Sequence, residues 1–388
     1  MKTILKYHIS ALLLASVFSL SFIIFLTQST LPFSKSGVKK IHTTKQAINS
    51  YTSSLSEGED AELNFIWSLQ EKKGVTLLGS SELSSSSPYV CHSYVSNNLN
   101  LRVSSFGHQH FQSFAMYCSL LAFKEDIRNS NICIIVSPGW FDKGGTNIEA
   151  FLEYVRPPFL DRIITDEQIS HQEKLAIGRY LCRNRYLINH PDKRINYFIN
   201  LFKFEHISYL RDYFINRKKE FKRVEYPDFK GQSIVGDVVQ IEWEKVFKEL
   251  EMNFVKSVHS NSYFINDDYY NEFLRENYDH GEFKDPGNEN QELKDLLLLV
   301  GFLKKNGANV SIIIQNLNPY HYQKLERFNP ILTKMTNYFD KNDVPYLNMF
   351  TADSKDYIPG TLDDIMHTGD LGWMKINKFL VDTYGEKK

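Results

Sequence analysis

The stretch VTLLGSSEL, residues 75–83, decides the fold. Its first four residues, Val75 to Leu78, form a short apolar run that contains β-branched residues, as in a buried strand. Gly79 lets the backbone turn tightly after this strand, and a serine at a strand-to-helix turn is held rigidly and points into a crevice. The pattern therefore predicts a strand that ends in a functional, serine-bearing turn.

Similar strand patterns recur along the chain, each followed by a helical one. The further predicted strands lie in LRVSSFG (101–107), ICIIVSP (132–138), VSIIIQ (310–315) and PYLN (345–348). The predicted helices lie in 60–73, 111–121, 292–305, 320–339 and 369–384. This alternation predicts a parallel sheet with helices on both faces, which binds ligands at the carboxyl ends of its strands. The loops after Leu78, Ser105, Val136, Gln315 and Asn348 should then crowd around one site.

A long helical and aromatic segment, about residues 147–290, interrupts the alternation. It includes an amphipathic stretch at 238–258 and few strand signals, so we expect an insertion of helices over one face of the domain. A chain of 388 residues suits one large α/β domain with insertions, which we place at 59–388.

The N-terminal region carries a nearly unbroken apolar run, residues 9–26, preceded by Lys2 and Lys6. Its length suits a single membrane-spanning helix, so residues 1–27 are predicted to be an anchor and 28–58 a Ser-, Thr- and Lys-rich tether. The alternative is a cleaved signal peptide, although no convincing small-x-small cleavage site follows. Lysines on both sides of the run leave the orientation open.

The composition narrows the classes of function. Hydrophobic residues make up 42% and charged residues 23%, which indicates a folded core. A net charge of -1 excludes a general attraction to nucleic acid. The four cysteines contain no CxxC motif, and their even number is compatible with an oxidising compartment. Cys118 and Cys133 lie in apolar surroundings and are interpreted as buried free thiols. Because the nearby His92, His108 and His110 lack an acidic companion, neither a metal nor a cofactor is expected.

A second candidate motif, Asp364-Ile-Met-His367, stands just before the last predicted helix. A serine hydroxyl becomes a good nucleophile when a neutral imidazole removes its proton and a carboxylate fixes the tautomer of that imidazole. The structural alternative is a helix-capping histidine beside a solvated aspartate. Together with the serine turn, however, the pair predicts a Ser-His-Asp triad.

Gly-x-Ser after the first strand and Asp-x-x-His before the last helix resemble the layout of SGNH hydrolases, with Ser80 in place of the Asp of their GDS motif. The resemblance implies a three-layer, flavodoxin-like α/β fold, with Ser81 as nucleophile and Asp364 and His367 as its partners. It also implies that Gly107 contributes an oxyanion-hole N–H. The segment after the third strand, residues 137–141, lacks the asparagine that supplies the third donor in that superfamily.

Four features of the sequence together resemble the DltD family of D-alanyl-lipoteichoic acid biosynthesis. They are the segment 137–141 without the asparagine, the GSSEL turn, Gln112-Ser113 and the terminal Asp-x-x-His-x-Gly. The resemblance implies an extracytoplasmic domain on the cytoplasmic membrane that helps place D-alanine esters on a cell-envelope polymer. The implied partners are that acceptor polymer, a D-alanyl donor or carrier, and a membrane-bound O-acyltransferase. Two alternatives stay open: an envelope esterase or thioesterase, and a non-catalytic scaffold that binds the carrier or the acyltransferase.

Two further features have competing interpretations. Trp140 and Phe141 are candidates for walls of an acyl-binding pocket, although aromatic residues after a strand are more often core. The basic run at 217–223 is a candidate contact for a polyanionic acceptor or for lipid headgroups, or else a solvated helix face.

Overall fold

The computed structural model describes residues 39–40, 51–52 and 59–385, except 143, 185–186, 188–189, 230–238, 259–260, 277–280 and 288. The predicted membrane span, residues 9–26, lies outside the described residues. Within the part of the chain that is described, no helix combines the length and apolarity needed to cross a bilayer.

Six strands form one parallel sheet in the order β2-β4-β3-β5-β7-β8. Their bounds are β2 Tyr51–Thr52, β3 Val75–Leu78, β4 Val103–Phe106, β5 Asn131–Val136, β7 Asn309–Ile314 and β8 Tyr346–Asn348. Five of them lie within or one residue from the predicted strands, because each is a short apolar run bounded by turn residues. The predicted parallel α/β architecture is therefore confirmed.

Two short strands fall within residues 28–58, where the sequence predicts a tether. Tyr51 and Thr52 form the edge strand β2, which pairs with β4. Lys39 and Lys40 form β1, which pairs with β6 (Val224–Glu225). Two residues are too few to show a strand period, so these pairings could not be recognised in the sequence.

Helices connect the strands and cover the sheet. The α-helices before the long connection are α2 Glu59–Gln70, α3 Cys91–Asn98 and α4 Ser113–Leu121. Between β5 and β7 the chain forms α5 Ile148–Tyr154, α6 Pro157–Thr165, α7 His171–Cys182, α8 Lys193–Lys203, α9 Ser208–Asn216, α10 Trp243–Ser257, α11 Asp267–Tyr269 and α12 Gln291–Lys305. The last two are α13 Asn329–Lys341 and α14 Asp370–Tyr384. The short 3-10 helices include η2 Ser81–Ser84, η3 Lys124–Asp126, η4 Pro138–Asp142, η6 Arg217–Glu220, η8 Leu325–Phe328 and η9 Ser354–Asp356, and a π-helical turn, η7, spans Tyr270–Leu274.

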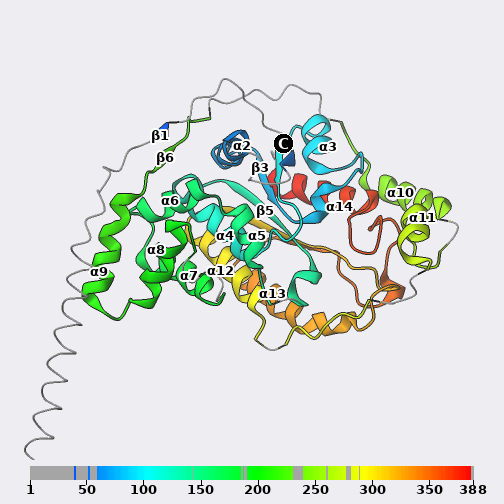
Figure 1. Cartoon of the computed structure of the whole chain (residues 1–388). Coiled ribbons are helices and arrows are strands. Elements are labelled where there is room, and N and C mark those ends of the chain that lie inside the picture. The colour runs from blue at the N-terminus through cyan, green and yellow to red at the C-terminus, as the bar shows by residue number, and fades with distance from the viewer. Residues whose placement is uncertain are drawn as a thin grey trace, which may run out of the picture.

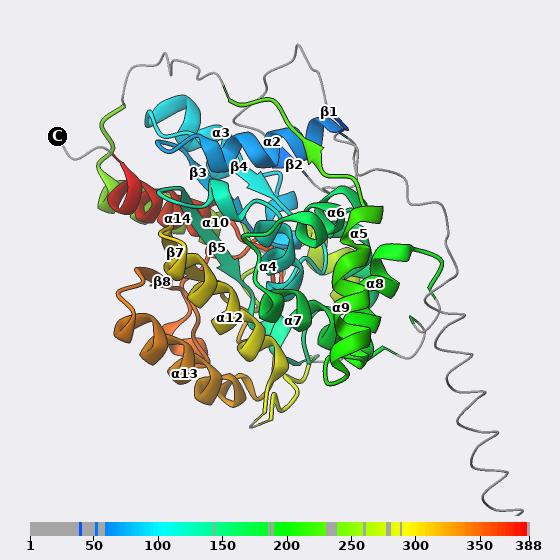
Figure 2. The same cartoon turned by 90° about the vertical axis from the view of Figure 1, so that its left-hand side faces the viewer.

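The sheet separates two hydrophobic cores, because successive side chains of a strand point to opposite faces. Leu78 belongs to the larger core, where α2, α4, α12 and α13 pack. Leu77 points the other way, into a smaller core with α3 and with Trp373 of α14. Figures 1 and 2 show α3 and α14 on one side of the strands and α4 and α12 on the other.

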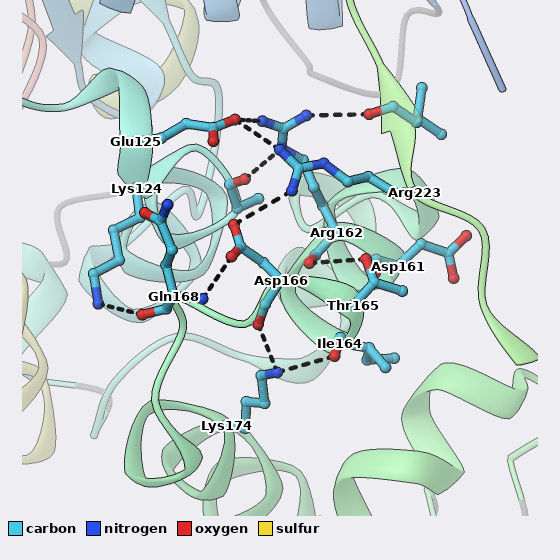
Figure 3. A network of polar contacts seen from close by, with 12 residues as sticks. Lys124, Glu125, Asp161, Arg162, Ile164, Thr165, Asp166, Gln168, Lys174 and Arg223 are labelled. Atoms are coloured by element: carbon cyan, nitrogen blue, oxygen red, sulfur yellow. Dashed lines mark hydrogen bonds and ion pairs between the residues drawn. The ribbon is translucent and has the colours of Figure 1, made fainter. Parts of the chain in front are cut away.

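The helices α5 to α9 extend the larger core. Figure 3 shows a polar network that joins α6 and α7 to η3 and to the segment around Arg223. Arg162 of α6 is 5% exposed and donates to the carbonyl oxygens of Ala122 (2.8 Å) and Val224 (3.1 Å). Its guanidinium also pairs with Glu125, which accepts a further bond from Arg223 at 2.9 Å. One buried cation thus joins the end of α4, η3 and β6.

One predicted helix begins later than the sequence indicated. The pattern predicted a helix from Tyr320, whereas α13 begins at Asn329 after the 3-10 turn η8. Lys324 has a φ of 59°, which interrupts a right-handed helix, and Pro330 fits only the first turn because it lacks an N–H. The prediction of a start at Tyr320 was wrong.

The four cysteines are free thiols. Cys118 and Cys133 are fully buried. Burial raises the pKa of the Cys133 thiol to about 12, so it stays protonated. The interpretation of these two residues as buried thiols is confirmed.

Candidate active site

The turn after β3 gives its two serines different environments. Ser80 is buried, and its Oγ donates to the carbonyl oxygen of His108 (3.1 Å) and accepts from the N–H of His110 (3.0 Å). Ser81 begins η2 and is partly exposed. The Ser80 hydroxyl is therefore engaged in holding the next loop, and Ser81 carries the accessible hydroxyl.

Gly79 and Gly107 bring the ends of β3 and β4 into contact. Gly107 has a φ of 134°, a conformation that favours glycine, and a Cβ there would lie 2.0 Å from the carbonyl oxygen of Gly79. The N–H of Gly79 donates to the carbonyl of Phe106 at 3.2 Å. The glycine predicted to supply an oxyanion-hole N–H therefore lies against the serine turn.

The predicted Asp364 and His367 are hydrogen-bonded to each other, with 2.6 Å between Asp364 Oδ2 and His367 Nδ1. The other carboxylate oxygen, Oδ1, accepts the backbone N–H groups of Met366 (2.8 Å) and His367 (2.7 Å). The Asp364 side chain is 11% exposed and that of His367 is 37% exposed. This bond leaves Nε2 as the imidazole nitrogen that can receive a proton.

Loops at the carboxyl end of β7 hold the Asp–His segment. The Asn318 N–H donates to the carbonyl of Ile365 at 3.0 Å, and the Gln315 amide donates to the carbonyl of Met366. The Asp363 N–H closes the turn on the His367 carbonyl at 2.9 Å. The Asp–His pair therefore lies at the edge of the sheet where β3 and β4 also end.

Hydrogen bonds across more than 280 residues join the serine turn region to the C-terminal helix. Ser87 Oγ donates to Asp370 Oδ1 at 2.6 Å, across 283 residues. Asn377 of α14 donates to the carbonyl of Tyr89 at 2.8 Å, across 288 residues. These bonds hold the segment that follows the serine turn against the start of the helix that follows the Asp–His pair.

Glu82 follows Ser81 directly in the GSSEL turn, and no motif in the sequence predicts a role for it. It is 2% exposed, and its Oε1 accepts the backbone N–H of Ser80 at 2.5 Å. Burial, partly offset by hydrogen bonds from the Ser80 and Glu82 N–H groups and by the charge of His367, raises its pKa to about 7. The signal available in the sequence was a glutamate directly after a candidate nucleophile; its burial is shown by the structure.

The pKa values of the Asp–His pair move apart. The hydrogen bond that His367 donates to Asp364 raises the pKa of His367, and the charges of Asp364, Glu82 and Asp363 raise it further, whereas burial opposes the shift. Burial would raise the pKa of Asp364, but the hydrogen bond and charge of His367 hold it below its usual value. The pair is thus arranged to favour an ionised aspartate beside a basic imidazole.

The aromatic residues after β5 lie in the core. Trp140 is 5% exposed and Phe141 is fully buried, with its ring centroid 5.3 Å from that of Phe328. These contacts favour the interpretation of both residues as core, and a role in substrate binding stays a prediction.

The basic run at 217–223 faces carboxylates of the same chain. Arg217 pairs with Glu220 at 2.7 Å, and Lys218 pairs with Glu167 at 2.9 Å. Figure 3 shows Arg223 reaching Glu125 and Asp166. These intramolecular pairs favour a structural role over a binding site for a polyanion.

A cleft of about 610 Å³ lies beside the Asp–His segment, at the carboxyl ends of β7 and β8. Asn316 and Thr361 line it near that segment, and Phe247 of α10 and Lys375 of α14 line its outer part. Its lining residues do not include Ser81, Asp364 or His367, so the cleft does not by itself mark the place where a substrate would meet these groups.

The fold and the site together define an α/β protein that carries an Asp–His pair and a serine turn at the carboxyl edge of a parallel sheet. A family model described as DltD protein matches residues 66–384, so the chain belongs to the DltD family. A comparison with individual curated proteins gives no match. The family is linked to D-alanylation of teichoic acids, which agrees at this level with the expected pathway and its kinds of partner.

Proposed function

We propose that the chain is an extracytoplasmic serine acyl-transfer enzyme that takes part in D-alanylation of a teichoic-acid type polymer. The observation that carries the proposal is the 2.6 Å bond between Asp364 and His367 at the sheet edge where the Ser81 turn lies. The three-layer arrangement and the motif order further support an SGNH-hydrolase-like assignment.

In the proposed mechanism Ser81 Oγ attacks the carbonyl carbon of a D-alanyl ester or thioester, and His367 Nε2 takes the hydroxyl proton. Asp364 keeps the proton on Nδ1 and stabilises the imidazolium. The N–H groups of Ser81 and Gly107 stabilise the negative charge that develops on the carbonyl oxygen, worth roughly 3–4 kcal/mol per donor. His367 then protonates the leaving group.

The second half of the reaction reverses these roles. A hydroxyl group of the acceptor polymer gives its proton to His367 and attacks the D-alanyl-Ser81 ester. The imidazolium returns this proton to Ser81 Oγ as the ester bond to Ser81 breaks, which restores the free serine. The predicted anchor at 9–26 would keep this chemistry at the outer surface of the cytoplasmic membrane, close to a membrane-bound O-acyltransferase.

The test compares the D-alanyl ester content of the envelope in cells that express the wild type or Ser81→Ala. We expect the variant to accumulate normally and to lose the esters. Normal ester levels in both Ser81→Ala and His367→Ala would contradict the mechanism and leave the non-catalytic scaffold as the explanation.

A second candidate, ester hydrolysis, is favoured by one observation: the His367 side chain is 37% exposed, which leaves room for water. The full chain in detergent, incubated with simple aryl esters, separates the two functions. Fast turnover without any pathway partner would favour the hydrolase, and slow turnover with retained D-alanylation would favour the transferase.

A further inference from the structure

Glu82 occupies an unusual position for a carboxylate. It is 2% exposed, directly follows the proposed nucleophile, and folds back to accept the Ser80 N–H at 2.5 Å. A Cβ on Gly79 would lie 2.7 Å from Glu82 Oε1, so the carboxylate fills the space that glycine leaves open. The side chain therefore belongs to the interior of the turn.

The charged groups near Glu82 come from the loop before α14. Among the described residues, His367 is a cationic group whose charge lowers the pKa of Glu82, and on its own loop His367 also interacts with Asp364 and Asp363. Asp370, which interacts with Asp363 and accepts from Ser87, lies at the start of α14. The His367 imidazole is thus in electrostatic range of carboxylates from both sides of the site.

A buried carboxylate is costly unless hydrogen bonds or an opposite charge compensate it. Glu82 has the Ser80 N–H bond at all stages, but its compensating charge exists only when His367 is protonated. His367 becomes an imidazolium when it takes the Ser81 proton. The interaction between Glu82 and His367 is therefore strongest while charge is separated, which is when it lowers the barrier.

We propose that Glu82 is a positioning residue whose buried carboxylate holds the Ser81 turn and stabilises the imidazolium form of His367 during acyl transfer. This inference rests on the proposed function, because it requires Ser81 to give its proton to His367. Asp364 orients the imidazole from Nδ1, and Glu82 adds a second negative charge from the side of the nucleophile.

The test measures how fast a serine-reactive fluorophosphonate labels the full-length protein in detergent, from pH 5 to pH 9. Glu82→Gln keeps an oxygen that can accept the Ser80 N–H and removes only the charge. We expect labelling of Glu82→Gln to be about tenfold slower on the alkaline plateau. Because the pKa of Glu82 is about 7, its carboxylate is ionised on the alkaline side of the wild-type profile and protonated on the acid side. Glu82→Gln lacks this charge throughout, so the midpoint of its pH dependence should fall by about half a unit to one unit.

Glu292→Gln is the matched control. Glu292 is also a fully buried glutamate that accepts a backbone N–H, from Ser113 at 3.0 Å, but it belongs to α12. This variant should label with the wild-type rate and midpoint. Glu82→Asp is the conservative variant, and it should label more slowly but retain the wild-type midpoint because it retains the charge.

Ser81→Ala tests the proposed function, and Glu82→Gln tests the role of Glu82, so the two can fail separately. Labelling that persists in Ser81→Ala overturns the proposed function. If Ser81→Ala abolishes labelling while Glu82→Gln keeps both the wild-type rate and the wild-type midpoint, only the role of Glu82 is overturned. Should Glu82→Gln unfold, a midpoint in Glu82→Ala equal to that of Glu82→Asp would overturn the charge effect.

Discussion

His367 determines, at the scale of single residues, the pH range in which the site can work. Its pKa lies above the ordinary value of about 6.5 because it is hydrogen-bonded to Asp364. Below that pKa the imidazolium cannot accept the Ser81 proton, so activity should rise with pH and reach half its maximum above pH 6.5. Labelling rates across pH measure this midpoint, and a midpoint at or below 6.5 would contradict the assignment of His367.

Asp364→Asn removes the main cause of that raised pKa. The midpoint should fall toward 6.5, and the maximal rate should fall by roughly 10²- to 10⁴-fold because the amide no longer fixes the productive tautomer. Asp363→Asn is the neighbouring control for the rate, since its hydrogen bond to His367 is made by the backbone N–H and its side chain acts on the imidazole through charge alone. Equal loss of rate in both variants would mean that the loop, rather than the Asp364 carboxylate, is what matters.

At the scale of elements, the contact between the ends of β3 and β4 positions the serine turn. Gly107→Ala would place a methyl group 2.0 Å from the Gly79 carbonyl and force a φ of 134° on alanine. We expect a loss of at least ~2 kcal/mol of stability together with loss of labelling at Ser81. Thermal unfolding and labelling measure the two effects.

Gly139→Ala is the matched control for this loop contact. A Cβ on Gly139 would meet only Ser137 Oγ, at 3.6 Å, which is an ordinary contact. Its unfolding temperature should stay near that of the wild type. Equal unfolding temperatures for the two alanine variants would argue against the close approach of the β3 and β4 loops.

Arg162 anchors the long helical connection between β5 and β7, so replacing it tests how that connection is held. Arg162→Met would leave the Ala122 and Val224 carbonyls and Glu125 without their donor, and should cost about 2–4 kcal/mol. Arg211→Ala, in an exposed pair with Asp212, should cost no more than ~0.5 kcal/mol. Unfolding in urea compares them, and similar losses would contradict the proposed anchoring role of Arg162.

For the whole molecule, buried acids make stability depend on pH. Burial is the main reason that the pKa of Glu292 is about 8 in the folded chain, against about 4.5 when unfolded. Between these values the folded chain holds a proton that the unfolded chain has lost. The contribution of Glu292 to the free energy of unfolding should therefore fall as pH rises from about 4.5 to about 8.

Glu292→Gln removes this titration and keeps an acceptor for the Ser113 N–H. At pH 8 the variant should be more stable than the wild type by roughly 1–3 kcal/mol, and near pH 5 the difference should shrink. Unfolding temperatures measured from pH 5 to pH 9 test this. A constant difference across that range would show that Glu292 does not titrate as described.

The sequence predicted those parts of the molecule in which one local pattern determines the outcome. Short apolar runs identified five strands, and Asp364 and His367 could be paired because both lie on one turn. Glu82 was missed because a carboxylate in a serine-rich turn is typical of an exposed residue, and the sequence does not show that this one is buried. The edge strand β2 and the late start of α13 depend on partners and on a left-handed residue at Lys324, which no periodicity reveals.

The central claim is that Ser81 is the hydroxyl that His367 activates. The most direct measurement is peptide mapping of the full-length protein after reaction with a fluorophosphonate, in the wild type and in His367→Ala. We predict a single adduct on Ser81 in the wild type and at least a hundredfold less in the variant. An adduct on another residue, or equal labelling of Ser81 without His367, would contradict the account.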